Sequence, residues 1–143
     1  MSLVLDASVA LAWIFERPTP AEASLADACL GGLADEPAWV PSLWHTEVAN
    51  SLLVAERRGV VSEAQVIDFA QRLSRLPLLT DDLTVASRQE AVMSLGRQHQ
   101  LTAYDATYLE LALRKGATLA TFDTRLARAM TSAGGALYGS PPS

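Results

Sequence analysis

The chain has 143 residues, half of them apolar, and a formal net charge of −5. This length and apolar content fit one domain with a full hydrophobic core, and the acidic balance argues against binding nucleic acid through a basic surface alone. The N-terminus has no signal-peptide pattern, and no run of about 18 apolar residues predicts a membrane span.

Apolar periodicity and turn residues predict strands that alternate with helices along the chain. In order, the predicted elements are a strand at 3–5, helices at 9–14 and 20–33, a strand at 38–40, helices at 43–58 and 63–74, a strand at 76–80, helices at 83–99 and 104–114, a strand at 117–122, a helix at 124–132 and a short strand at 136–138. Ser42 and Ser62 are expected to cap the helices that follow them.

This alternation predicts a parallel sheet with helices on both faces, formed by a single domain over residues 1–138. The helical pair at 43–74 is expected to project from the sheet as an arm, because two helices separate the second and third strands. The Gly-, Pro- and Ser-rich tail at 139–143 is expected to be disordered. Cys29 is expected to be a small buried hydrophobe, and a lone cysteine without a disulfide favours a reducing cytoplasm.

Two acidic residues stand directly after predicted strands. Asp6 ends the first strand and Asp123 ends the fourth, and each precedes a helix. The carboxyl ends of strands in an open parallel sheet are where ligands bind, so both are candidate metal ligands or bases. Either one alone could equally be a helix cap that accepts backbone N–H bonds.

Two further acids lie in the first turns of predicted helices. Asp105 heads an apolar face, since Leu109 and Ala112 follow at i+4 and i+7, and an acid on such a face needs a partner. Placement at the positive end of the helix is the alternative explanation for Asp105. Glu47 borders the apolar stripe of its helix and taken alone could be a surface residue.

Together, the four acids can face the same edge of a sheet. Clustered carboxylates repel one another unless a cation neutralises them, and sites rich in oxygen ligands suit Mg²⁺ or Mn²⁺. Ser8 and Thr121 lie close in sequence to Asp6 and Asp123 and could orient a carboxylate or a water, or bond only to local backbone.

Other residues have weaker claims to a site. Asp81 and Asp82 also follow a strand; they are interpreted as a helix cap and its neighbour, and are the first alternatives for the site. His45 and His99 have no partner at zinc-ligand spacing.

Four motifs resemble those of the PIN domain family, in the same order along the chain. They are LVLDAS at 3–8, EVAN at 47–50, LTAYDATY at 101–108 and ATFDTRL at 120–126. The resemblance covers essentially the whole chain, and its size without an added domain looks most like the VapC toxins of toxin–antitoxin pairs.

The resemblance implies an α/β fold of the three-layer α/β/α sandwich type with a central parallel sheet. It also implies a Mg²⁺- or Mn²⁺-dependent endoribonuclease that forms a homodimer and is inhibited by a cognate VapB-like antitoxin. By the matching motifs, Asp6, Glu47, Asp105 and Asp123 form the catalytic, metal-binding cluster, and Asp6 and Asp105 are its firmest ligands. The supporting positions that match are Ser8, Asn50 and Thr121.

The expected reaction is hydrolysis of RNA phosphodiester bonds, with DNA left open as a second substrate. Because the net charge is acidic, contacts with RNA would fall to the metal and to arginines such as Arg57, Arg58 and Arg125. The main alternative is a non-catalytic protein-interaction module with a PIN-like fold, in which a groove near Trp13, Trp39 and Trp44 binds a partner. A nucleotide-binding or phospho-acceptor domain lacks support, since the chain has no glycine-rich phosphate loop.

Overall fold

A parallel four-stranded sheet lies at the centre of the computed structural model, which describes residues 2–139. The strands are β1 (Leu3–Leu5), β2 (Ala38–Val40), β3 (Leu78–Thr80) and β4 (Thr118–Ala120). Their order is β3-β2-β1-β4, with Val4 paired to Trp39 on one side and to Leu119 on the other. All three pairings are parallel, so the carboxyl ends of the strands meet at one edge of the sheet.

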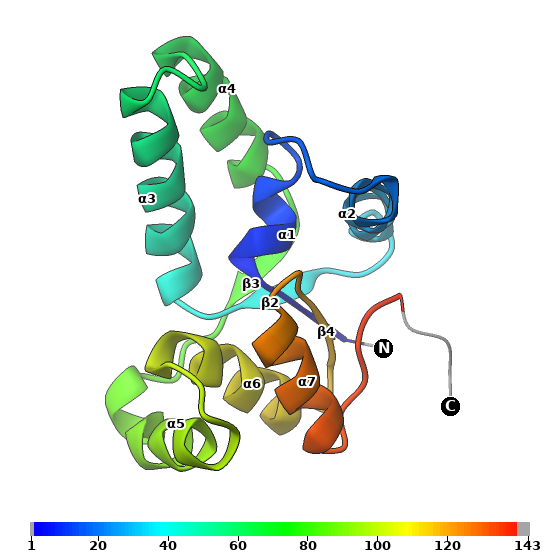
Figure 1. The fold of residues 1–143 in the computed structure, drawn as a ribbon, viewed down its shortest axis with the longest axis vertical. Coiled ribbons are helices and arrows are strands. Elements are labelled where there is room, and N and C mark those ends of the chain that lie inside the picture. Colours follow the sequence, from blue (N-terminus) through cyan, green and yellow to red (C-terminus); the bar gives the residue numbers. More distant parts are fainter. Residues whose placement is uncertain (1, 140–143) are drawn as a thin grey trace.

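Seven helices surround this sheet among the described residues. They are α1 (Ala7–Leu11), α2 (Pro20–Gly32), α3 (Leu43–Arg57), α4 (Glu63–Ser74), α5 (Val85–His99), α6 (Ala103–Lys115) and α7 (Thr124–Ser132). Figure 1 shows α5, α6 and α7 on one side of the sheet and α1 and α2 on the other. The expected α/β class and three-layer α/β/α arrangement are therefore confirmed.

The arm predicted at residues 43–74 is also present. Figure 1 shows α3 and α4 as a pair that extends away from the sheet on the side of α1. Ser62 begins α4 with a reciprocal capping box, in which its hydroxyl accepts from the Gln65 N–H and its own N–H donates to the Gln65 side chain. The tight connection between the two helices thus has a local cause in the sequence.

The hydrophobic core fills the space on both sides of β1 and β4. The fully buried side chains include Val4, Leu5, Leu119 and Leu126, together with much of α6. Cys29 is 1% exposed and burial raises the pKa of its thiol to about 11, so it is the small buried hydrophobe that was expected. No helix among residues 2–139 combines the length and the apolar character needed to cross a bilayer.

Three local predictions were wrong. Ser42 makes no capping hydrogen bond, because the backbone already turns at Pro41, whose carbonyl accepts from the Trp44 N–H. The first helix ends at Leu11 instead of continuing to 14, and the Trp13 indole donates to the Ala26 carbonyl of α2. The segment at 136–138 forms a single parallel bridge, Leu119 to Leu137, instead of a strand.

The strands predicted at 76–80 and 117–122 were also too long, because β3 and β4 have three residues each. In the predicted tail, Gly139 is described with a positive φ of 82° and residues 140–143 lie outside the described residues.

Candidate active site at the carboxyl edge of the sheet

Asp6 stands where β1 ends, and its carboxylate bridges two strand ends. The side chain is 6% exposed, and the Asp6 N–H donates to the Ala120 carbonyl at the end of β4. Its Oδ2 accepts hydrogen bonds from the Ser8 hydroxyl at 2.7 Å and the Thr121 hydroxyl at 2.6 Å. The carboxylate caps no helix in the structure, so the capping interpretation of Asp6 was wrong.

Ser8 and Thr121 each make a second bond across the same edge. The Ser8 hydroxyl accepts from the Phe122 N–H at 3.1 Å, and the Thr121 hydroxyl accepts from the Asp123 N–H at 3.0 Å. The two hydroxyls therefore donate to one carboxylate oxygen while they fix the backbone that carries Asp123. This is more than the local backbone bonding that their sequence positions left open.

Asp123 is exposed and performs two roles at once. Its Oδ1 accepts from the Leu126 N–H at 2.8 Å, so it does cap α7, as the alternative interpretation had it. Its charge also raises the pKa of both Asp6 and Asp105, which places it close to those carboxylates. Capping uses one carboxylate oxygen, and the other is left without a protein donor among the described residues.

Glu47 reaches the site from the second turn of α3. Its Oε1 accepts a hydrogen bond of 2.7 Å from the hydroxyl of Tyr108, a residue of α6 that is 0% exposed. Tyr108 lies within the LTAYDATY motif, but the motif alone does not indicate a role for it in the site. Its position at i+3 from Asp105 places both on one face of α6, and that spacing was the available signal.

Asp105 lies in the first turn of α6, which Thr102 caps by accepting from the Asp105 N–H at 3.2 Å. The carboxylate is half-buried and has no hydrogen-bond donor among the described residues. Dipole placement explains the first-turn position but does not explain the proximity of three other acids.

The four carboxylates interact unfavourably in the absence of a cation. Burial is the largest cause that raises the pKa of Asp6, Glu47 and Asp105, and that of Asp105 rises to about 6. Charge repulsion adds to it, from Asp123 on Asp6, from Asp6 and Asp105 on Glu47, and from Asp123 and Asp6 on Asp105. The hydroxyls of Ser8, Thr121 and Tyr108 oppose the shift by donating to the ionised forms.

This donor set fits a hard divalent cation in its chemistry. It offers carboxylate oxygens only, with no thiolate or imidazole among the interacting groups, and such sets suit Mg²⁺ or Mn²⁺. Within residues 2–139, no three acids stand together as a ready-made cage for a metal ion. The residues that would hold a cation here are the four acids, and Mg²⁺ in proteins is commonly bound by one or two carboxylates together with water.

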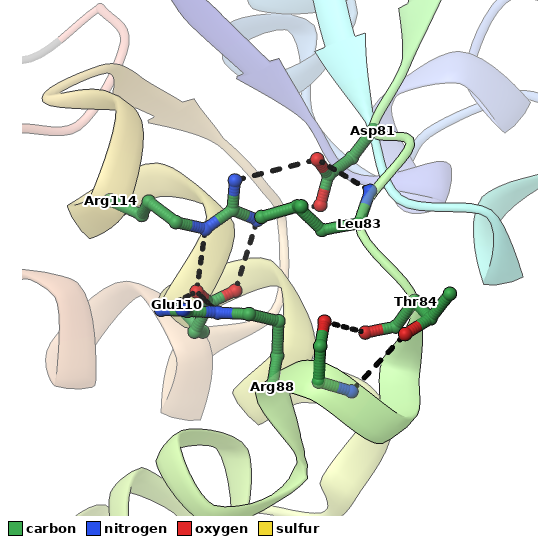
Figure 2. Close-up of polar contacts among 7 residues, drawn as sticks. Asp81, Leu83, Thr84, Arg88, Glu110 and Arg114 are labelled. Carbon is green, nitrogen blue, oxygen red and sulfur yellow. Dashed lines mark hydrogen bonds and ion pairs between the residues drawn. The ribbon is translucent and has the colours of Figure 1, made fainter.

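Asp81, the first alternative for the site, belongs to a different cluster. Its carboxylate accepts from Arg114 at 2.6 Å, and Arg114 also donates to Glu110, which is 5% exposed and binds Arg88 (Figure 2). Thr84 and not Asp81 caps α5. Asp81 thus joins the end of β3 to α5 and α6, and the predicted capping role was wrong.

The remaining candidates lie apart from the acids. Asn50 is exposed on α3 and makes no hydrogen bond to them, and the His45 Nε2 pairs with the Thr80 hydroxyl at 2.9 Å. Trp13 and Trp44 line two separate hollows of about 430 Å³ and 380 Å³, while Trp39 lies under the Lys115 ammonium. The three tryptophans do not share one groove.

Comparisons with known proteins place this geometry in a family context. The family model described as the PIN domain matches residues 3–130. The chain is 32% identical over 130 residues to "Ribonuclease VapC3" of Pyrobaculum aerophilum, a match that covers 89% of this chain and 93% of that protein.

Two solved structures share the fold. One is PAE2754 from Pyrobaculum aerophilum, with a TM-score of 0.66 and 24% identity, covering 90% of this chain and 79% of the other. The second is FitAcB from Neisseria gonorrhoeae, with a TM-score of 0.63 and 19% identity, covering 97% of each chain. At these identities the structural likeness establishes the arrangement of strands and helices alone.

Proposed function

Because the chain belongs to the PIN domain family, we propose that it is a divalent-metal-dependent endoribonuclease, a VapC-type toxin that hydrolyses RNA phosphodiester bonds. The observation that carries the proposal is the gathering of acids at one sheet edge, where burial first and repulsion from neighbouring carboxylates second raise the pKa of Asp6, Glu47 and Asp105. Carboxylates that the fold keeps close together although they repel one another are typical of sites that bind a cation.

The four acids have two kinds of role in the proposed mechanism. Asp6, Asp105 and Asp123 would hold Mg²⁺ or Mn²⁺, and Glu47 would complete the coordination or position the attacking water. The bound cation would supply an activated water and offset the charge that develops on phosphoryl oxygens. The chain's own residues bind and orient these groups.

The hydroxyl donors fix the direction of the carboxylates before RNA arrives. Ser8 and Thr121 both donate to Oδ2 of Asp6, so two hydroxyls fix the orientation of a carboxylate that would hold the cation. Tyr108 likewise donates to Oε1 of Glu47 and partly offsets the effect of burial, which raises the pKa of this carboxylate. Because hydrogen bonds already orient these carboxylates, little free energy is needed to reorient them when substrate binds.

A cognate VapB-like antitoxin and a second copy of the chain are the proposed protein partners. Both follow from the likeness to VapC proteins. Apolar side chains exposed on the arm, Leu53, Val60 and Ile67, supply a surface that a partner could cover.

The decisive experiment is cleavage of a total RNA pool, by protein that mass spectrometry shows to be free of a second polypeptide. Wild type in Mg²⁺ is expected to give discrete products, and EDTA or Asp6→Asn to remove them, with a rate loss of at least about 100-fold. Asp82→Asn, an exposed acid outside the cluster, is the matched control and should cleave like wild type. No products in any lane, or full activity of Asp6→Asn, would contradict the proposal.

A parallel reaction with single-stranded and duplex DNA tests the substrate class. RNA products without DNA products support a ribonuclease, whereas equal cleavage of both would widen the activity to a general nuclease. Sequencing the ends of the RNA products would then identify the target and the cleaved bond.

The alternative, a non-catalytic interaction module, is favoured by one observation. The hollow of about 430 Å³ at Trp13 is lined by side chains from the segment after α1, from α2 and from α4, and its apolar members, such as Ile14, Leu30 and Phe69, suit a bound partner segment. Under this alternative, Asp6→Asn would leave partner binding and cellular function intact. Loss of toxicity in that variant with partner binding retained would favour the nuclease.

A further inference from the structure

A hollow distinct from those at Trp13 and Trp44 lies between the end of α5 and one face of α7, and we term it the α7 hollow. Its volume is about 300 Å³ and its lining is mainly polar. The residues that line it are His99, Gln100, Arg125, Arg128, Ala129 and Ser132. None of them is acidic, although the chain as a whole carries a net charge of −5.

The two arginines of the α7 hollow are available to a ligand. Arg125 and Arg128 are exposed, stand about one turn apart on α7, and form no ion pair with any residue from 2 to 139. Four other arginines of the chain are already engaged with carboxylates, namely Arg17, Arg72, Arg88 and Arg114. The α7 hollow therefore gathers two guanidinium groups whose donors face only solvent.

His99 lines the α7 hollow with a polar ring. Its Nε2 is buried and has no hydrogen-bond partner in the structure. Within the part of the chain described, the only other such side-chain atom is Trp44 Nε1. Because the His99 Nε2 is closed to solvent, the inference rests on the two arginines and not on His99.

Both walls of the α7 hollow lie close along the chain to an acid of the candidate site. Asp123 caps α7 two residues before Arg125, so Arg128 stands about 7.5 Å further along the helix axis than Asp123. On the other wall, Gln100 turns the chain at a φ of 55° between α5 and α6, and Asp105 follows in the first turn of α6. The arginines of the α7 hollow thus stand within about two helical turns of Asp123 along α7.

We propose that the α7 hollow binds backbone phosphates of single-stranded RNA beside the bond to be cleaved. This inference rests on the proposed function and deepens it by assigning the path that the bound RNA strand follows away from the acids. Arginine donates two N–H groups in a planar fork that matches a phosphate, and here no carboxylate competes for it. The acids themselves repel RNA, so cationic contacts beside them are required to hold it.

The test measures binding apart from cleavage. A fluorescent single-stranded RNA is titrated with protein in EDTA at several salt concentrations, and the logarithm of the association constant is plotted against that of salt. Each phosphate contact to a single strand contributes a slope of about −0.7. Arg125→Ala with Arg128→Ala is expected to make the slope shallower by about 1.4 if each arginine holds one phosphate.

The matched control is Arg75→Ala with Lys115→Ala, which removes the same charge from the opposite edge of the sheet. Both side chains are exposed, and they stand shortly before β3 and β4, at the amino ends of these strands and away from the acids. This pair is expected to change the slope by less than half as much. An RNA of equal length with uncharged methylphosphonate linkages should bind wild type and the Arg125/Arg128 variant equally weakly.

Three outcomes would overturn the inference. They are an unchanged slope in the Arg125/Arg128 variant, an equal change in the control pair, and loss of binding to a protein partner with RNA binding intact. Melting temperatures equal to wild type would show that the variants are folded, which is expected for the Arg125/Arg128 variant because neither arginine has a partner to lose.

Measuring both cleavage and the salt slope distinguishes a failure of this inference from a failure of the proposed function. Cleavage of the RNA pool in Mg²⁺ with an unchanged slope would retain the nuclease and remove the subsite. If wild type never cleaves RNA but the salt slope is shallower in the Arg125/Arg128 variant and unchanged in the control, the phosphate subsite is supported and the proposed nuclease activity is wrong.

Discussion

At the scale of single residues, hydroxyl groups decide how the acidic cluster is held. Asp6 is buried among like charges, which disfavours its ionised form, and the Ser8 and Thr121 hydroxyls offset this by donating to Oδ2. Thr121 also accepts from the backbone N–H of Asp123. One threonine therefore links two of the proposed metal ligands.

Replacing Thr121 should weaken catalysis more than it weakens the fold. In Thr121→Val the shape is kept, but Asp6 loses a donor and the Asp123 backbone loses an acceptor, so we expect a rate loss of about 10- to 100-fold. Mg²⁺ affinity, measured by isothermal titration calorimetry, should fall with it. Thr118→Val, at the start of β4 and away from the acids, is the control; equal rates for the two variants would contradict the assignment.

Tyr108 provides a second test at this scale. Tyr108→Phe removes the 2.7 Å bond to Glu47, and loss of a hydrogen bond to a charged group costs about 1.5–3 kcal/mol. The pKa of Glu47 should then rise further, which would move the acid limb of the pH–rate profile to higher pH. Tyr104→Phe is the control, since Tyr104 is 64% exposed. An unshifted profile in Tyr108→Phe would separate Tyr108 from the site.

The raised pKa of Asp105 gives a pH prediction for the metal-free protein. Its pKa rises from 3.8 in the unfolded reference to about 6 in the fold, so the folded state holds the proton more tightly. Stability from this group is full below the lower value and is lost as pH rises through the upper one. In EDTA, the free energy of unfolding should therefore fall between about pH 4 and 6.5 more steeply for wild type than for Asp105→Asn.

Denaturant titrations across that pH range measure the difference between the two proteins. Added Mg²⁺ at neutral pH should reverse the loss in wild type, because a ligand of the folded state stabilises it by mass action. Parallel pH curves for wild type and Asp105→Asn would show that Asp105 is not the group responsible.

At the scale of secondary-structure elements, an ion-pair cluster fixes the helices beside the site. Glu110 accepts from Arg88 of α5 and Arg114 of α6, and Arg114 continues to Asp81 after β3 (Figure 2). These bonds join three elements, and α6 carries both Asp105 and Tyr108. The cluster therefore supports the acidic edge without contributing a ligand to it.

Glu110→Gln should destabilise the whole domain. Removing the charge leaves two arginines without their shared partner, and breaking a buried pair of this kind costs about 3 kcal/mol, reduced where the arginine is exposed. Urea titration should show a lower midpoint with an unchanged m-value. Glu90→Gln on the exposed face of α5 is the matched control, and a similar midpoint in both variants would argue against the cluster's role.

At the scale of the whole molecule, the arm leaves apolar side chains in solvent. Val60 is 65% exposed at the turn between α3 and α4, and Leu53 and Ile67 are 44% and 50% exposed on the two helices. Apolar residues gathered on a projecting element are typical of contact surfaces. They give the proposed homodimer a place to form.

We expect light scattering after gel filtration to give about twice the mass of one chain. Ile67→Asp should lower that mass toward a monomer, because an acid would be buried in the interface without a partner. Met93→Asp, on α5 and 45% exposed, is the control. A monomeric wild type, or dissociation by Met93→Asp alone, would place the interface elsewhere or remove it.

The order of strands and helices was predictable from the sequence, since apolar periodicity and caps such as Ser62 and Thr102 act locally. Asp6, Glu47, Asp105 and Asp123 could be named as candidates from the sequence, because the carboxyl ends of parallel strands meet at one edge of a sheet, and their role as metal ligands stays a prediction. The end of the first helix at Leu11 was not predictable from the sequence. The turn that follows it is accompanied by a hydrogen bond from the Trp13 indole to the Ala26 carbonyl, which joins two separate segments of the chain.

Only the tertiary structure decided which polar groups meet. Asp81 and Asp123 both follow strands, yet Asp81 pairs with Arg114 and Asp123 acts on Asp6 and Asp105. The bond from Tyr108 to Glu47 spans 61 positions, and the α7 hollow combines residues from two helices that are separated along the chain by α6. Local sequence determines which elements form, whereas long-range packing sets the partners of each charge, because those partners come from distant elements.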